Sequence, residues 1–325
     1  MRRRDFIAGL SGAAAWPVVA RGQLPAIPVI GILRYQSQRS EASRLEAIRQ
    51  GLQETGFVEG QNVRVELRFA DGERDRLSAL AGELIAHRVA VLIANTTPPA
   101  LAAKTATTTI PVVFVTGVDP VELNLVESLN RPGGNLTGVT FLSNKLVAKR
   151  LEMLCEVVPP AAAIGMLAAQ QNPNTPTDVR DTQAAADALG RTMQVMKVAN
   201  ASDIDAAIAE LVRQRVAALF IAPQANFRDW QRQILTLAVR HALPTSFSSG
   251  DFVAAGGLMS YGPDQHDSYR QAGVYAGRIL KGEKPAELPV MQSAKFEIVV
   301  NLKTAKAIGV TIPPTLFAIA TQVIE

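Results

Sequence analysis

The residue types that carry out covalent and metal chemistry are scarce in this chain of 325 residues. It contains one cysteine, Cys155, and three histidines, His87, His241 and His266. These histidines lie too far apart to form a sequence motif for a metal site. The sequence also lacks the G-x-G-x-x-G, G-x-x-x-x-G-K-[ST], G-x-S-x-G and H-E-x-x-H motifs. We therefore expect no catalysis, no metal and no cofactor. Instead we expect a site that binds its ligand by hydrogen bonds and charge.

Polar side chains suited to hydrogen bonding gather where the predicted strands of the first half of the chain end. Thr96 and Thr97 follow a predicted strand and precede Pro98 and Pro99, which fit the first turn of a helix. Free N–H groups at a helix start suit a carboxylate, and a threonine there can also serve only as the helix cap, so both roles stay open. The predicted ligand-binding residues of this half are Tyr35, Ser37, Thr96, Thr97, Thr116, Gly117 and Asp119.

Two of these residues have an equally ordinary structural interpretation. Tyr35 ends the first predicted strand, where it can stack on a flat solute or simply be a surface tyrosine. Asp119 precedes Pro120, where it can contact a ligand or form a turn.

The second half offers a similar set of side chains after its predicted strands. Asn172 and Asn174 flank Pro173, where an amide can bind a polar solute without adding charge or can stabilise a turn. Asp251 can bind an ammonium group or start a helix, and both interpretations stay open. The predicted ligand-binding residues of this half are Asn172, Asn174, Gln224, Phe247, Asp251 and Tyr261.

The elements that position these residues alternate along the chain from Pro28 to about Asn301. Short β-branched runs predict strands, and the stretches between them have helical periodicity, which is typical of βαβ units with a mainly parallel sheet. The predicted fold class is α/β. Predicted strands are 29–34, 63–69, 89–94, 112–116, 136–141, 164–168, 194–198, 217–221, 245–248 and 258–261. Predicted helices are 44–54, 74–87, 99–107, 121–129, 145–157, 177–189, 204–214, 227–241 and 265–281.

The second series of elements resembles the first. The segment HRVAVLIA at 87–94 aligns with QRVAALFI at 214–221, an offset of 127 residues. The repeat predicts two similar lobes. In each lobe the loops at the carboxyl ends of the strands form the usual ligand crevice of an open parallel sheet, so two facing lobes would make a cleft.

Several blocks of sequence resemble the ABC transporter substrate-binding protein family related to tryptophan-binding proteins. They run in order through the chain after residue 20: GLQETGFVEGQN at 51–62, AAKTATTTIPVVF at 102–114, DP at 119–120, NRPGGNLTG at 130–138, AGGLMSYG at 255–262 and KFEIVVNLKTAKAIG at 295–309.

The resemblance implies a type I periplasmic binding protein fold: two Rossmann-like lobes with parallel sheets, joined by a three-segment hinge. It implies a small solute in the cleft, an aromatic or other amino acid among the candidates, and delivery to an inner-membrane ABC permease. In that topology lobe one spans 27–141 plus 263–287, and lobe two spans 142–262 plus 288–325. The expected hinge crossings are 141–145, 260–263 and 288–292. The resemblance also favours a fixed turn at Asp119 and Pro120, slightly over a direct ligand contact. We expect a monomer.

Residues 1–20 have the pattern of an export signal. A basic start with Arg3 and Arg4 precedes an apolar stretch that Pro17 ends, and Ala20 fits a cleavage site. The arginine pair resembles a twin-arginine signal, so we expect a protein exported to the periplasm.

The net charge argues against nucleic acid as a partner. The formal net charge is +4, of which residues 1–20 carry +2, so the remainder is too weakly basic to predict nucleic-acid binding.

One alternative role stays open besides import. The protein could be a periplasmic sensor that passes ligand occupancy to a receptor kinase.

Overall fold

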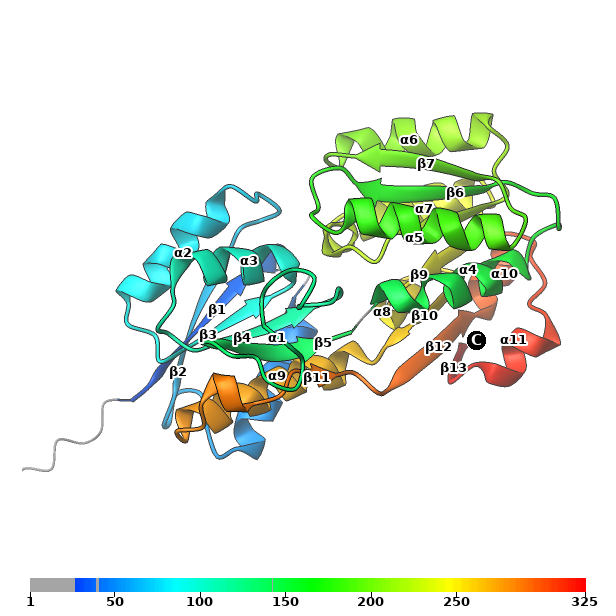
Figure 1. Cartoon of the computed structure of the whole chain (residues 1–325). Coiled ribbons are helices and arrows are strands. Elements are labelled where there is room, and N and C mark those ends of the chain that lie inside the picture. Colours follow the sequence, from blue (N-terminus) through cyan, green and yellow to red (C-terminus); the bar gives the residue numbers. More distant parts are fainter. Residues whose placement is uncertain (1–26, 39–40, 142) are drawn as a thin grey trace, which may run out of the picture.

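The computed structural model describes residues 27–38, 41–141 and 143–325. The export signal expected at residues 1–20 lies outside these ranges. The described chain forms two α/β lobes, each built on one sheet (Figure 1). The strands pair in parallel, except that β10 and β12 are antiparallel. The predicted α/β class with two mainly parallel sheets is confirmed.

The sheet of lobe one has the strand order β11-β5-β4-β3-β1-β2. Its strands are β1 (Val29–Arg34), β2 (Arg64–Phe69), β3 (Val91–Asn95), β4 (Val112–Thr116), β5 (Leu136–Thr140) and β11 (Met291–Gln292). The four strands β1, β3, β4 and β5 are buried along their whole length. Helices cover both faces, which explains why these strands are continuous apolar runs. Helices α1 (Ala42–Glu54) and α9 (Gln265–Leu280) pack on one face, and α2 (Arg76–Ala86) and α3 (Thr97–Ala106) on the other.

The sheet of lobe two has the order β13-β12-β10-β9-β8-β6-β7. Its strands are β6 (Ile164–Ala169), β7 (Met193–Val198), β8 (Ala218–Ile221), β9 (Thr245–Phe247), β10 (Met259–Pro263), β12 (Phe296–Asn301) and β13 (Gln322–Ile324). Its helices are α4 (Val147–Cys155), α5 (Thr175–Ala188), α6 (Ser202–Arg213), α7 (Gln231–Arg240), α8 (Gly250–Ala254), α10 (Leu302–Ala307) and α11 (Pro314–Ile319). Lobe two also contains the short 3-10 turns η2 (Ser143–Leu146) and η3 (Ala225–Arg228), and lobe one contains a third such turn, η4 (Pro285–Glu287).

One predicted helix is wrong. The segment 121–129 forms consecutive turns instead of a helix, because several N–H groups bond back to the carbonyls of Asp119 and Pro120. Asn124 adopts a left-handed φ of 53°, which ends any right-handed helix at that residue.

The internal repeat is confirmed by the backbone. Both sheets contain five parallel strands in the same order, β2-β1-β3-β4-β5 in lobe one and β7-β6-β8-β9-β10 in lobe two. Arg88 and Arg215, which are 127 residues apart, both adopt a left-handed φ, of 54° and 58°. The lobes are therefore two copies of one chain path.

A pair of glycines repeats with the strands. A Cβ on Gly31 of β1 would touch Leu84 and Val89, and a Cβ on Gly165 of β6 would touch Leu211 and Val216. The partners are again 127 residues apart. Gly31 thus lets α2 pack close to β1, and Gly165 lets α6 pack close to β6.

The chain crosses between the lobes three times, after β5, between β10 and α9, and between β11 and β12. Met291 and Gln292 still pair with β5 of lobe one, and β12 of lobe two begins at Phe296. We therefore propose a third hinge crossing at 293–295, a few residues later than the sequence suggested. We propose the other boundaries between the two lobes at the positions that the sequence suggested.

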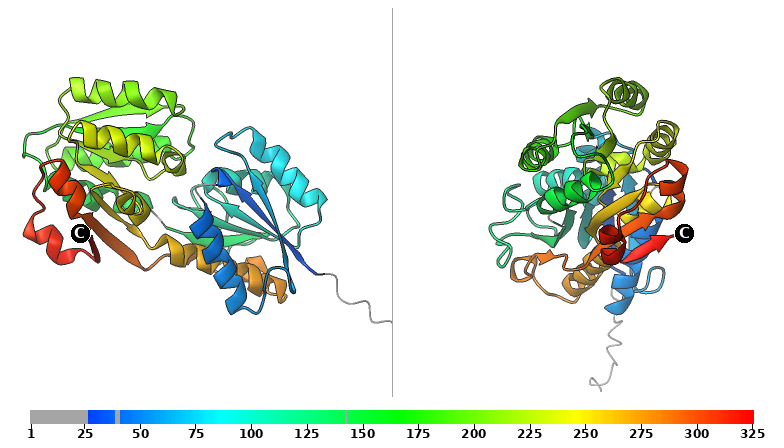
Figure 2. Two further views of the ribbon diagram at one scale, coloured as in Figure 1. Left: turned by 180° about the vertical axis from the view of Figure 1, so that it is seen from behind. Right: turned by 90° about the vertical axis from the view of Figure 1, so that its right-hand side faces the viewer.

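Helix α9 returns from lobe two to pack against α1 of lobe one (Figure 2). Glycines allow this close approach. A Cβ on Gly51 or Gly273 would lie within 3 Å of a backbone atom of the opposite helix, and a Cβ on Gly277 would lie within 3 Å of Thr55, the residue that follows α1. Within the ranges that the structure describes, no helix is long and apolar enough to cross a membrane.

Candidate functional site

A pocket lies between the two lobes at the carboxyl ends of their strands. Gln36 follows β1, Thr96 follows β3 and Gly117 follows β4, while Asn172 follows β6 and Gln224 follows β8. The space between the lining side chains is about 650 Å³ when the open solvent at its mouth is included. The wall also includes Glu41, Arg44, Thr97, Pro98, Val115, Phe141, Ser143, Asn174, Pro223, Ala225, Arg228, Ser248, Phe252, Gln265 and Tyr269.

A cluster of five charged side chains lies at one end of this pocket, and three of them, Glu41, Arg44 and Arg228, belong to its wall. Glu41 is 1% exposed and pairs with Arg34, the last residue of β1, and its Oε1 lies 3.9 Å from Nε of Arg228. Arg44 and Arg228 each donate to Oδ2 of Asp251, at 3.0 and 2.9 Å. We call these five residues, Arg34, Glu41, Arg44, Arg228 and Asp251, the charge cluster. It joins the lobes, because Arg228 and Asp251 belong to lobe two.

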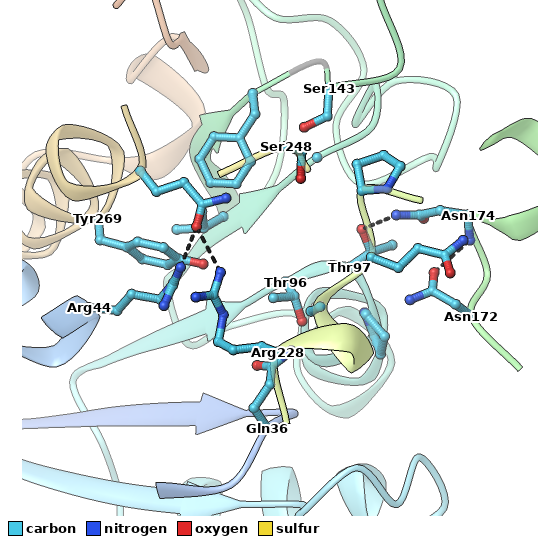
Figure 3. A pocket seen from close by; sticks show the side chains of 18 of the residues that line it. Gln36, Arg44, Thr96, Thr97, Ser143, Asn172, Asn174, Arg228, Ser248 and Tyr269 are labelled. Carbon is cyan, nitrogen blue, oxygen red and sulfur yellow. Dashed lines mark hydrogen bonds between the residues drawn. The ribbon is translucent and has the colours of Figure 1, made fainter. Parts of the chain in front are cut away.

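Two residues of α9 support the charge cluster from lobe one. Oε1 of Gln265 accepts from Arg44 at 2.5 Å and from Arg228 at 3.2 Å (Figure 3). The Tyr269 ring lies beneath the guanidinium of Arg44, 5.3 Å from its centroid, a cation–π contact. The guanidinium groups are thus fixed in orientation by an amide and an aromatic face.

Burial changes the ionisation of this cluster. It lowers the pKa of Arg34 to about 9 and that of Arg228 to about 10, since a charged guanidinium loses its hydration there. Burial raises the pKa of Asp251, but the nearby charges of Arg44 and Arg228 lower it more, so the net pKa lies below the usual value. The Asp251 carboxylate is therefore held ionised.

Amide and hydroxyl groups form the opposite end of the pocket. Asn172 donates to Oδ1 of Asn226 at 3.0 Å, and Asn226 in turn donates to the Tyr35 hydroxyl across the cleft at 3.1 Å. Asn174 donates to Oγ1 of Thr97 at 3.4 Å, a second link between the lobes. Figure 3 shows Asn172 and Asn174 on the far side of Thr97 from Arg44.

Gln224 lines the pocket but its amide is already occupied. Its Oε1 accepts from the N–H of Ala169 at 2.6 Å, and its Nε2 donates to Thr175 at 2.9 Å and to Asp178 at 2.8 Å. With both amide hydrogens used, Gln224 fixes the loop after β8 and has no donor left for a solute.

The start of α3 has its prolines in the first turn, as predicted, but no threonine side chain caps it. The helix begins at Thr97, so Pro98 and Pro99 occupy positions whose N–H groups would otherwise be free, and few donors remain for an anion. Thr96 has φ 80° and ψ 167°, a backbone region that residues other than glycine rarely adopt. This strained residue lies at the wall of the pocket.

Several buried polar atoms around the pocket have no hydrogen-bond partner among the described residues. They are Nε2 and Oε1 of Gln36, Nη1 of Arg44, Oγ1 of Thr96 and Oδ1 of Asn174. Buried polar atoms are normally satisfied, so unpartnered atoms in the wall of one space make that space the candidate site for a polar solute.

The structure places the predicted site residues in two groups. Thr96, Thr97, Gly117, Asn172, Asn174 and Gln224 line the pocket. Their contact with a solute stays a prediction.

The other predicted residues lie outside the wall of the pocket. Tyr35 is buried, with its hydroxyl on Asn226, and Ser37 donates to Asp229 at 2.8 Å. Thr116 is buried behind Thr97, with 2.8 Å between their hydroxyl oxygens. Asp119 accepts from the N–H of Val121 at 2.9 Å, as the turn interpretation expected.

Three predicted residues of lobe two also lie away from the pocket wall. Phe247 is 1% exposed and stacks on Phe252 in the core of lobe two, so Phe252 lines the pocket in its place. Tyr261 packs near Phe296. Asp251 has its carboxylate on Arg44 and Arg228, which argues against its predicted role as the partner of an ammonium group.

Sequence reasoning missed the residues that helices contribute. Arg44 was assigned to a helix and Arg228 to the start of another, and neither follows a strand directly. Gln265 and Tyr269 come from α9, more than 200 residues after Arg44 in the sequence. Their only signal was the expected return of the final helix to lobe one. Within the described residues no group of histidine, cysteine and carboxylate side chains could hold a metal ion.

Comparison with known proteins gives consistent matches. A family model described as ABC transporter substrate binding protein matches residues 29–324. A curated relative named tyrosine-binding protein, from Clostridioides difficile (strain R20291), is 26% identical over 277 residues, covering 84% of this chain and 79% of the relative. A solved ABC domain in complex with L-Trp, from Streptococcus pneumoniae, superposes with a TM-score of 0.83 at 27% identity, covering 91% of this chain and 99% of that one. A conserved domain protein from Vibrio cholerae gives 0.85 at 24% identity, covering 91% and 99%.

Proposed function

The chain belongs to the ABC transporter substrate-binding protein family, and we propose that it binds a small solute in the pocket between its lobes and delivers that solute to a membrane permease. The family is one of solute-binding proteins and not of enzymes. The observation that carries the proposal is the ring of unpartnered polar atoms on Gln36, Arg44, Thr96 and Asn174 around one interlobe space.

Amino acids are the first class of solute to test. The relative from Clostridioides difficile is named for tyrosine, and the structure from Streptococcus pneumoniae contains L-Trp. Both are about one quarter identical to this chain, so the loops around the pocket have room to differ in specificity. The wall contains two aromatic rings from lobe one, Phe141 and Tyr269, and one from lobe two, Phe252, which suit a flat or apolar group.

Periplasmic location is part of the proposal. The signal pattern at residues 1–20 fits export, and a family of importers needs its binding protein outside the cytoplasm. Cleavage after Ala20 is tested by N-terminal sequencing of the protein recovered from the periplasmic fraction.

Ligand binding is tested by a thermal-shift screen of the purified protein with amino acids, aromatic acids, purines and sugars. A ligand at about 100 times its Kd stabilises the folded state by about 2.7 kcal/mol, which raises the Tm by several degrees. If no compound of any class raises the Tm, the proposed function is wrong.

A pair of glycine variants locates the binding site. Gly117 lines the pocket, and a Cβ there would point at Ser143, so Gly117→Leu fills the space and should abolish the Tm rise. Gly134→Leu is the matched control, since a Cβ on that exposed glycine meets no atom within 4 Å. Equal ligand responses from the two variants would place the site elsewhere.

A further inference from the structure

We propose that the solute is an organic anion: a carboxylate without an ammonium group, bound with its carboxylate against Arg44 and Gln36. This inference rests on the proposed function and names the chemical class that the pocket between the lobes accepts. Three observations carry it: the charge count of the charge cluster, the free donors beside it, and the state of its carboxylates.

The charge cluster has one more cation than it has anions. Arg34, Arg44 and Arg228 are 0%, 4% and 10% exposed, and of the two carboxylates that they face, Glu41 is 1% and Asp251 is 51% exposed. Buried charges are tolerated when they are paired, so an excess positive charge at the wall of a pocket favours an anion in that pocket. A bound carboxylate would bring the group to neutrality, whereas a zwitterion would leave the excess charge unchanged.

Two residues of the pocket wall, Arg44 and Gln36, on either side of Arg228 (Figure 3), have unpartnered hydrogen-bond donors. Nη1 of Arg44 and Nε2 of Gln36 are buried and have no partner among the described residues. Nη2 of Arg44 is fixed by Asp251 and Gln265, which sets the plane of the guanidinium before a solute arrives. A guanidinium held in this way presents a charge-assisted donor to a carboxylate oxygen.

The carboxylates of the charge cluster are already occupied by arginines. Glu41 is the only carboxylate in the pocket wall as the structure describes it, and it faces Arg34 and Arg228 while accepting from Asn95 at 2.9 Å. Asp251 accepts from Arg44 and Arg228. An ammonium group bound here would have to approach these guanidinium groups, which repel it.

The other end of the pocket is neutral. Oδ1 of Asn174 is unpartnered and lies on the far side of Thr97 from Arg44, whereas the unpartnered Oγ1 of Thr96 belongs to a residue between Arg228 and Thr97 (Figure 3). A hydroxyl or amide group on the solute satisfies such acceptors without bringing charge. The geometry therefore fits a carboxylate at one end of the solute and a neutral donor at the other.

Matched pairs of compounds test the inference on the unmodified protein. Isothermal titration compares L-phenylalanine with 3-phenylpropanoate, and L-tyrosine with 3-(4-hydroxyphenyl)propanoate, which differ only by the ammonium group. Phenylethylamine and tyramine, which keep the ammonium but lack the carboxylate, complete the set. We expect each carboxylate to bind at least tenfold more tightly than its amino acid, and the amines not to bind.

Two outcomes would overturn the inference and leave the proposed function intact. One is tighter binding of either amino acid than of its carboxylate partner. The other is a Tm rise given by sugars, purines or amines in the broad screen with none given by any carboxylate. If no compound of any class binds, the proposed function itself has failed.

Variants on one helix link the preference to the charge cluster. Arg44→Gln should weaken binding of 3-phenylpropanoate about tenfold or more, because a charge-assisted hydrogen bond is lost. Arg49→Gln on the same helix is the matched control, since Arg49 pairs with Glu59 on the surface. Equal affinities in the two variants would contradict the assignment, and the compound pairs on the wild-type protein decide the matter if Arg44→Gln fails to fold.

Discussion

At the scale of single residues, the core of lobe two contains a carboxyl group that is held away from water. Asp178 of α5 is 2% exposed and accepts from Gln224, and the buried guanidinium of Arg150 lies near enough to act on its charge. Burial raises the pKa of Asp178 to about 6, and the hydrogen bond from Gln224 and the charge of Arg150 only partly offset this. Asp178 thus makes lobe two sensitive to pH.

The protonated Asp178 carboxyl should contribute to the free energy of unfolding in full below about pH 4, and this contribution should be lost as the pH rises through about 6. The folded state holds its proton over this range and the unfolded state does not, so ionisation costs the folded state up to about 3 kcal/mol. Asp178→Asn mimics the neutral form and lacks this loss. Denaturant titrations between pH 4 and 7 should show the free energy of unfolding of wild type falling relative to Asp178→Asn.

The control for this measurement is Asp187→Asn on the same helix, which removes an exposed carboxylate that is not among the groups acting on the pKa of Asp178. Carboxylates shared by wild type and variant cancel in the difference. A difference between wild type and Asp178→Asn that stays constant from pH 4 to 7 would refute the raised pKa.

Single residues also show what the sequence could predict of the site. The rule that ligands bind at the carboxyl ends of parallel strands led to Thr96, Gly117 and Asn174, which line the pocket. The same rule chose Phe247 and missed Phe252, because it cannot tell which of two nearby aromatic rings faces the core. Side-chain direction depends on packing that no local pattern encodes.

At the scale of elements, the contact between α1 and α9 depends on small residues. A Cβ on Gly273 would lie within 3 Å of the backbone carbonyl of Ile48, which cannot move aside as a side chain could. Gly273→Ala should therefore reduce the free energy of unfolding by about 1–3 kcal/mol, as overpacking usually does. Denaturant titration with fluorescence detection measures the change.

Gly82→Ala is the matched control for helix propensity. Gly82 is an exposed residue of α2, and a Cβ there would meet no atom within 4 Å. This substitution should raise the stability by about 0.5–1 kcal/mol, since alanine is the better helix former. If Gly273→Ala were also stabilising, the two helices would not be in backbone contact.

Elements were predicted more completely than the site because their signals are local. The periodicity of lobe one placed β1 and β4 at their observed bounds, and the repeat extended the same order to lobe two. The helix predicted at 121–129 failed because Asp119, Pro120 and Asn124 favour turns over helix. Arg44 and Tyr269 reach the pocket only because α9 packs on α1, a contact between distant segments.

At the scale of the whole molecule, polar pairs join the lobes on several sides of the pocket. Besides the charge cluster, Asn226 donates to Tyr35 and Asn174 donates to Thr97. At the surface, Oγ of Ser37 donates to Asp229 at 2.8 Å. A protein that opens and closes needs such contacts to be individually weak, so that a solute can shift the population between the two states.

The Ser37 and Asp229 pair should favour the closed arrangement of the lobes. A surface pair contributes about 0.2–1 kcal/mol, so Asp229→Ala should shift the ratio of closed to open molecules by up to about fivefold. Small-angle scattering of the protein without solute should then give a larger radius of gyration. Glu210→Ala, which removes an ion pair within α6, is the control and should leave the radius unchanged. Because the contact needs both partners, Ser37→Ala added to Asp229→Ala should increase the radius no further, and an additive effect would mean that the two residues act on the lobes separately.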